Sequence, residues 1–217
     1  MKAFPLIAIA WLLGSGPAAA QDVAPIARGD AHFVIGWQNL HKEQPANHYN
    51  DWLNSIFYGG AGAGWYWNDH LKTQVDIGAG TKGTQYRFEE LVLNGTRTGL
   101  SSRVSTRQAN IAIGQQYQFF RNQWFHPHAG GGIELVRESS TEEYQPVFVF
   151  DNVTRTGREV VPARNNETEH RIFARPFVES GFKAYMTRRA FFTADSRLMF
   201  RGGIDEVLFR FGFGVDF

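Results

Sequence analysis

The chain has 217 residues, and its 22 Lys and Arg stand against 21 Asp and Glu, so the charges balance once Lys2 is set aside. This balance argues against a protein that binds nucleic acid electrostatically. The absence of cysteine excludes a disulfide scaffold, a thiolate nucleophile and a cysteine metal site.

The first twenty residues have the pattern of a secretory signal. Lys2 precedes the apolar run AFPLIAIAWLLG, and Ala18 and Ala20 form an A-x-A cleavage pattern. An uncleaved membrane anchor is the alternative, but a spanning helix needs roughly 20 apolar residues and this run is shorter. We therefore predict a signal peptide over residues 1–20 that is cut before Gln21, a periplasmic segment over 21–29, and one β-domain over 30–217.

Eight later stretches alternate apolar and other residues with a period of two, which is the pattern of β-strands. Roughly 9–11 such residues, when tilted, cross a bilayer. Their apolar positions include, in chain order, Phe33, Ile35 and Trp37, then Ala61, Ala63 and Trp65, then Val75 and Ile77, then Ile111 and Ile113, then Ile133 and Leu135, then Ile172 and Val178, then Phe192 and Leu198, and finally the residues from Val207 to the C-terminus.

The connections between these stretches differ at the two ends. WYWNDHL, FFRNQWF and AYMTRRAFF are short polar turns between aromatic or long apolar residues, whereas the connections at about 41–54, 81–102, 138–170 and 202–206 are predicted to be longer. Short turns at one end and longer loops at the other are typical of outer-membrane barrels. Aromatic side chains beside the turns suit a membrane–water boundary. A soluble β-sandwich, the alternative, would vary its turns at both ends.

Together with the C-terminal FRFGFGVDF, these features resemble a small eight-stranded outer-membrane β-barrel of the OmpA/OmpX type. The resemblance covers the whole mature chain and implies an all-β, antiparallel, up-and-down transmembrane barrel in the cell outer membrane. It also implies a terminal signal that the barrel assembly machinery reads, formed by Phe209, Phe211, Phe213, Val215 and Phe217. Because this fold hosts adhesins, enzymes, pores and structural proteins, the function must be argued from particular residues.

The face opposite the lipid carries charges of both signs. Eight strands leave an interior just wide enough for side chains to fill, so these charges predict a closed polar network rather than an open pore. Glycines at 60, 62 and 64 would leave room for larger side chains that cross the lumen. The predicted network consists of Lys72, Asp76, His126, His128, Glu134, Arg175, Glu179, Lys183, Asp195, Arg197, Arg210 and Asp216.

No catalytic residue, metal ion or cofactor is predicted. His126 and His128 share a face, but Glu134 lies roughly 20 Å from His126 along a strand, too far to bind the same ion. A lipopolysaccharide-modifying enzyme is the less favoured alternative. A lipid A deacylase of this kind would need a His, a Ser and a carboxylate that face the lipid, whereas these two histidines face inward.

The long loops are the stronger functional lead. Residues 81–102 contain Asn94 and Gly95, a strong two-residue turn signal, and residues 138–170 contain a second candidate hairpin around 155–157. Both are expected to project above the bilayer, where exposed edges could bind a surface ligand. The alternative is that they only rigidify the rim of the barrel.

Three arginines are predicted on the lipid-facing side at the outer strand ends: Arg103, Arg107 and Arg137. There they could pair with lipopolysaccharide phosphates, or they could simply be solvated above the membrane. The sequence thus predicts a monomeric outer-membrane barrel with a closed polar lumen and a structural or adhesive role at the cell surface. Its partners would be lipid, lipopolysaccharide and a surface ligand, with no nucleic acid. The alternative function is a narrow channel for small solutes.

Overall fold

The computed structural model describes residues 28–41, 52–93, 96–119, 124–144, 146–151, 156–161 and 167–217. The predicted signal peptide and nearly all of the predicted segment over 21–29 lie outside these ranges. No helix in the described part of the chain is long and apolar enough to cross a membrane. The strands are β1 (Gly29–His41), β2 (Trp52–Tyr66), β3 (Leu71–Gly80), β4 (Gly83–Leu93), β5 (Thr96–Gln118), β6 (Phe125–Tyr144), β7 (Val147–Asp151), β8 (Thr156–Val161), β9 (Glu167–Tyr185), β10 (Ala190–Phe200) and β11 (Ile204–Asp216).

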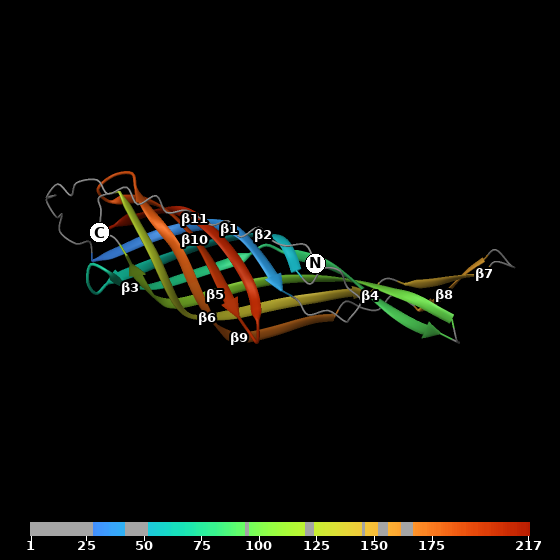
Figure 1. The fold of residues 1–217 in the computed structure, drawn as a ribbon. Coiled ribbons are helices and arrows are strands. Elements are labelled where there is room, and N and C mark those ends of the chain that lie inside the picture. The colour runs from blue at the N-terminus through green and yellow to red at the C-terminus, as the bar shows by residue number, and fades with distance from the viewer. Residues whose placement is uncertain are drawn as a thin grey trace, which may run out of the picture.

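Eight of the described strands close into an antiparallel barrel (Figure 1). Their order is β3-β2-β1-β11-β10-β9-β6-β5, and the pairing of β3 with β5 completes the circle. β4 follows β3 in the chain and pairs with β5 beyond the part that β3 covers. The predicted fold class is therefore confirmed.

The first and last strands form a continuous seam. β1 pairs with β11 from Asp30 opposite Asp216 to Leu40 opposite Glu206. Gly29 and Phe217 extend this ladder, since each donates its backbone N–H to the carbonyl of the other, at 3.0 and 2.9 Å. Closure of this kind leaves no barrel edge with unpaired backbone groups in lipid, where such groups would be costly.

The two ends of the barrel are unlike. At one end, here called the turn end, residues 67–70, 119–124 and 186–189 connect the strands, and both Gly29 and Phe217 lie there. At the opposite end, the loop end, Leu93 pairs with Thr96 in a β4–β5 hairpin, and β7 pairs with β8. Figure 1 shows both hairpins reaching beyond the barrel. Both predicted hairpins are thus confirmed, although their turns at 94–95 and 152–155 lie outside the described residues.

The prediction of a long connection at 202–206 is wrong. β10 ends at Phe200 and β11 begins at Ile204, so only residues 201–203 connect them. Gly202 has a φ of 77°, a left-handed conformation that glycine adopts without strain, and this allows the chain to reverse within so few residues.

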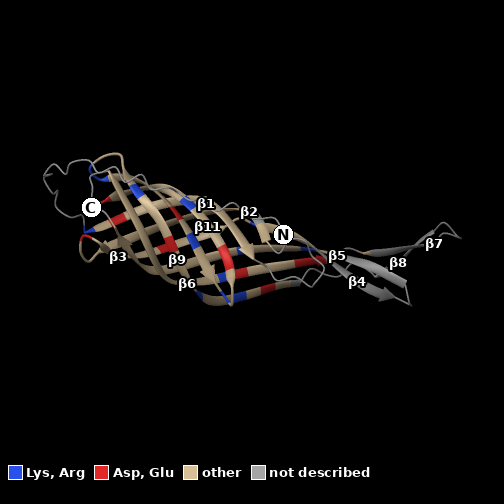
Figure 2. Ribbon diagram, viewed as in Figure 1, with Lys and Arg blue, Asp and Glu red and all other residues tan. Residues whose placement is uncertain are grey.

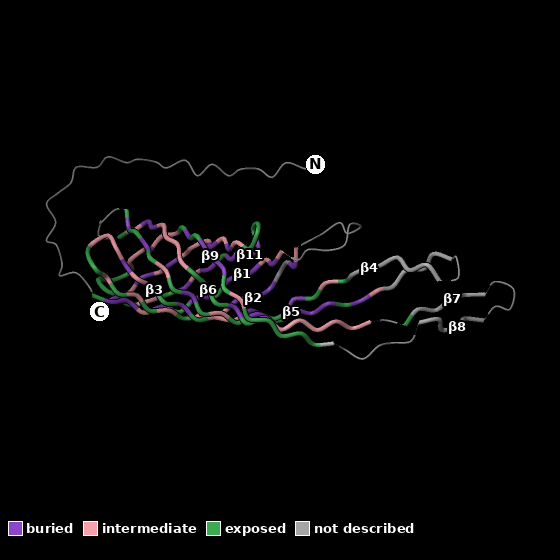
Figure 3. Tube along the Cα trace, turned by 90° about the horizontal axis from the view of Figure 1, so that it is seen from below, coloured by how far each residue is buried: buried purple, intermediate pink, exposed green. Residues whose placement is uncertain are grey.

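The outer wall of the barrel is apolar. Buried and exposed residues alternate along the strands (Figure 3), and the exposed set includes Phe33, Trp37, Val75, Ile77, Ile111, Ile113, Ile133, Leu135 and Val178. Exposed aromatic residues gather near the turn end, namely Trp65, Trp67, Tyr117, Phe119, Trp124 and Phe217. An apolar belt of this extent is expected to contact lipid rather than water.

Candidate functional site

The lumen is filled by side chains in successive layers, and the first lies near the turn end. Asp30 is its centre: Oδ2 accepts hydrogen bonds from the Lys72 ammonium and the Tyr66 hydroxyl, both at 3.0 Å, and from the Lys183 ammonium. Lys183 also pairs with Asp216 at 3.4 Å. Two ammonium groups therefore face two carboxylates, and this layer is electrically balanced.

A second charged layer lies halfway along the barrel and contains two guanidinium groups. Arg197 donates to Asp76 at 2.6 Å and to Glu179 at 2.7 Å. Arg210 donates to Asp195 at 2.7 Å and to Asp76 at 3.2 Å. Asp76 thus joins both arginines. Such sharing satisfies buried charges that would be very costly alone. Figure 2 shows residues of both signs spread along the barrel strands.

The third charged layer lies toward the loop end and is built around one arginine. Arg175 is 1% exposed and pairs with Glu134 at 2.8 Å, with Asp205 and with Glu206. Arg201 extends this layer toward the loop end, since it donates two hydrogen bonds to Asp205, at 3.0 and 3.2 Å.

An apolar layer separates the second and third charged layers. On β9, Phe177 lies between Arg175 and Glu179, and the Phe177 ring lies 4.1 Å from the Arg197 guanidinium carbon. The buried side chains of this layer are Val34, Tyr58, Ala112, Phe177, Met199 and Leu208. The prediction of a polar lumen is therefore incomplete. In a closed interior, apolar side chains fill space as well as they do in a protein core, and a guanidinium can stack on an aromatic face.

The two predicted lumen histidines lie near the turn end. His128 is buried, and its Nδ1 has no hydrogen-bond partner among the residues that the structure describes. The ring of His126 lies 4.8 Å from that of Tyr185. Glu134 is far from both, because it belongs to the Arg175 layer. Among the residues that the structure describes, no group of three or more His, Asp or Glu side chains is arranged to hold a metal ion.

Each predicted network residue lies in the interior, but sequence reasoning missed several of their partners. His32, whose Nε2 lies 3.1 Å from Asp76, already lies on the inward face of the first predicted stretch, and Asp30 could have been found by extending that stretch by one residue. Asp205 and Glu206 were missed because residues 202–206 were predicted to be a loop. Glycines at 62 and 64 have the predicted role, since a Cβ at either would collide with lumen side chains such as His32 and Lys72.

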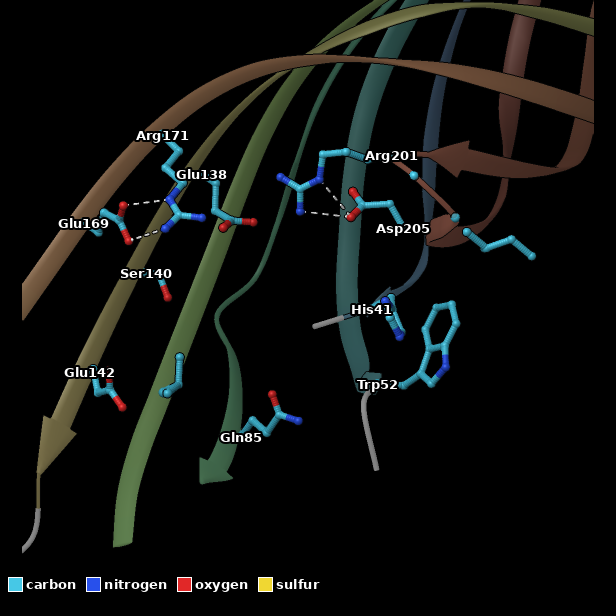
Figure 4. Close-up of a pocket in the computed structure, with 14 residues that line it drawn as sticks. His41, Trp52, Gln85, Glu138, Ser140, Glu142, Glu169, Arg171, Arg201 and Asp205 are labelled. Atoms are coloured by element: carbon cyan, nitrogen blue, oxygen red, sulfur yellow. Dashed lines mark hydrogen bonds and ion pairs between the residues drawn. The ribbon is translucent and has the colours of Figure 1, made fainter. Parts of the chain in front are cut away.

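Beyond the Arg175 layer, the loop end opens into a cavity of about 1030 Å³, here called the mouth cavity (Figure 4). Arg171 donates to both carboxylate oxygens of Glu169, at 2.7 and 2.9 Å, and this bonding raises the pKa of Arg171 above its ordinary value. The ring of Trp52 lies 5.2 Å from that of His41. The polar and aromatic lining consists of His41, Trp52, Gln85, Glu138, Ser140, Glu142, Glu169, Arg171, Arg201 and Asp205. The mouth cavity thus offers guanidinium, carboxylate, amide and aromatic groups to a polar molecule.

No protein-family model matches the chain, and no curated protein matches it in sequence. Solved structures do resemble it. Neisserial surface protein A (NspA) has a TM-score of 0.53 at 13% identity, with 87% of this chain and 97% of that chain covered. The outer membrane protein OprG of Pseudomonas aeruginosa has a TM-score of 0.52 at 14% identity, with 88% and 97% covered. The chain has the fold of an outer-membrane β-barrel.

This fold and the apolar outer wall place the protein in the cell outer membrane. In barrels of this kind the short turns face the periplasm and the longer loops face outward. The loop end and the mouth cavity therefore face the outside of the cell, and the exposed aromatic residues of the turn end lie at the periplasmic boundary.

The three arginines predicted to bind lipopolysaccharide are all exposed on the outer wall near the loop end. Arg137 pairs across strands with Ala109, only two residues from Arg107, so these two arginines are neighbours. Arg103 lies four residues beyond Arg107 and opposite Glu143. The structure thus brings two of the three arginines together and sets the third beside a carboxylate.

Proposed function

We propose that the protein is a non-enzymatic surface-interaction barrel, in which the filled lumen is a rigid support and the loop end binds a polar partner outside the cell. One contrast carries this proposal. The lumen holds fully buried side chains as large as Arg175, Arg197, Tyr58 and Lys183, whereas a cavity of about 1030 Å³ opens at the mouth. Space for a ligand is therefore found outside the charged layers, on the side that faces the environment.

The lining of the mouth cavity favours a hydroxyl-rich ligand such as a saccharide. Arg171 and Glu169 present a guanidinium and a carboxylate side by side, and Arg201 and Asp205 repeat this arrangement across the cavity (Figure 4). Paired donors and acceptors of this kind suit vicinal hydroxyl groups, which both donate and accept hydrogen bonds. Trp52 adds an aromatic surface that can cover an apolar face of the ligand. A few placed polar groups in a concave site are the usual basis of specificity.

Binding of the purified protein, held in lipid nanodiscs, to a panel of immobilised oligosaccharides would test this proposal. We expect Trp52→Ala and Arg171→Gln to weaken the best signal at least about tenfold, since each removes a side chain of the lining. Arg188→Gln, in an exposed turn at the opposite end, is the control that also removes one positive charge. Equal binding by all four proteins, or no binding above that of an empty nanodisc, would contradict the proposal.

A narrow channel and a lipopolysaccharide-modifying enzyme make different predictions. Steady conductance steps from the purified protein in planar bilayers would favour the channel. A change in lipopolysaccharide acylation between cells with and without the protein would favour the enzyme. Our proposal expects neither, because buried side chains such as Phe177 and Met199 fill the lumen between the charged layers and because the proposed ligand is bound without reaction.

A further inference from the structure

The outer wall contains an apolar groove of about 650 Å³ near the loop end. The strand register explains its shape. Gly59 pairs with Ala79, Ala79 with Ala109, and Ala109 with Arg137. Three small residues therefore form a row across neighbouring strands, and this row ends at an arginine. Larger apolar side chains border this row, namely Ile77, Ile111, Leu135 and Ile172.

The internal packing of the barrel does not require the groove to be hollow at Gly59. A Cβ added there would meet no atom within 4 Å, and the backbone is not in the left-handed region. Gly78, on the neighbouring strand, is different, because a Cβ there would collide with the ring of Tyr58. The effect of glycine at position 59 is therefore on the outside of the wall, where a larger side chain would fill part of the groove. A hollow in this wall has to be filled by an apolar group from outside the barrel, since an empty one would forfeit dispersion contacts.

Positive charges border the groove on its loop-end side. Arg137 lines it, and Arg107 lies diagonally opposite Arg137 across β5 and β6. Lys82 precedes Gly83, which pairs with Thr106, so Lys82 lies beside Arg107. All three cations are exposed. The outward neighbours of Arg107 on the next described strands are Ser139 and His170, neither of which is acidic.

We propose that the groove and these cations bind one lipopolysaccharide molecule of the outer leaflet, with an acyl chain in the groove and a phosphate on Lys82, Arg107 and Arg137. Guanidinium groups match phosphate oxygens in geometry and charge. Cations at the hydrocarbon boundary also need an anion nearby. This site is separate from the mouth cavity and does not depend on the proposed function. The proposed phosphate site differs from the three arginines predicted from the sequence. It omits Arg103, which lies opposite Glu143, and includes Lys82.

The test is binding of fluorescent lipopolysaccharide to the purified protein in detergent micelles, with folding verified by the different gel mobility of unboiled and boiled samples. We expect the double variant Arg107→Gln/Arg137→Gln to bind roughly 30-fold more weakly, about fivefold for each cation removed. We expect Gly59→Leu to bind about tenfold more weakly, because the added side chain displaces one or two methylenes of the acyl chain. Arg103→Gln and Ala63→Leu, outside the groove, are the matched controls and should bind like the wild type.

Four results would overturn the proposal. Unchanged affinity of both folded groove variants would exclude the site. Equal binding of dephosphorylated lipopolysaccharide, or of phosphatidylglycerol micelles, would exclude recognition of lipopolysaccharide phosphate. Equal competition by deacylated lipopolysaccharide would exclude the acyl chain from the groove. Conversion of a dimer to a monomer by Gly59→Leu, with lipopolysaccharide binding intact, would make the groove an interface with a second copy of the chain.

Discussion

Removal of the Arg175 guanidinium should destabilise the barrel strongly. Arg175 pairs with Glu134, Asp205 and Glu206, and both glutamates are fully buried. In Arg175→Met, Asp205 keeps its bonds to Arg201. Glu134 and Glu206 lose their ion pair, and burial of a carboxylate without a cation is costly.

The expected loss in the free energy of unfolding is about 3–5 kcal/mol, the usual cost of removing one partner from a buried ion pair. The double variant Arg175→Met/Glu206→Gln should recover part of this loss, because one of the two carboxylates left without a cation becomes a neutral amide. Arg171→Gln is the control, since it breaks an ion pair whose two side chains are 58% and 60% exposed. Its stability should stay close to that of the wild type.

Urea unfolding of the protein in lipid vesicles, followed by tryptophan fluorescence, would measure these differences. Five of the six tryptophans lie after the predicted signal peptide, and exposed ones such as Trp65 and Trp67 report transfer from lipid to water. If Arg175→Met unfolds at the same urea concentration as Arg171→Gln, the Arg175 layer contributes no stability and the reasoning fails. If the double variant is less stable than Arg175→Met, the Glu206 carboxylate without its cation is not the cause of the lost stability.

Other predictions follow from the seam and the lumen. Deletion of Phe217 should lower the fraction of protein that assembles in the outer membrane, measured by gel mobility without boiling; normal assembly would contradict its role in closure. Gly78→Val should cost about 1–3 kcal/mol in urea unfolding because it collides with Tyr58, whereas Gly59→Val should be nearly neutral, and equal costs would count against this packing. Phe177→Ala should cost about 3–5 kcal/mol and Phe177→Leu clearly less; similar values for both would show that the apolar layer is loosely packed.

Alternation along the chain was enough to predict the barrel, its eight strands and most of the inward charges, because lipid and lumen impose opposite polarities on successive residues. It could not predict the apolar layer. Val34 and Leu208 lie at inward positions although their side chains would also suit lipid. Residue type alone does not distinguish a lipid-facing apolar residue from one packed inside the lumen.

The groove was beyond sequence reasoning for a different reason. Gly59, Ala79 and Ala109 belong to three strands, and they become one surface only when the register of β2, β3 and β5 is known. Register depends on turns and bulges along the entire circle of strands, which periodicity does not encode. The same limit applies to the arginines. Their outward direction was predictable, but the pairing of Arg103 with Glu143 was not.

The positions of the two hollows support the proposal that the protein binds its partner outside the cell. The turn end is occupied by the ion pairs of Asp30 with Lys72 and Lys183, whereas the mouth cavity and the groove both lie toward the loop end. A barrel that passed solutes would need comparable openings at both ends and a polar path between them. A barrel that only anchored itself in lipid would need neither hollow. The two hollows near the outer end, one facing water and one facing lipid, are the features that support the proposed surface ligand and the proposed lipopolysaccharide site.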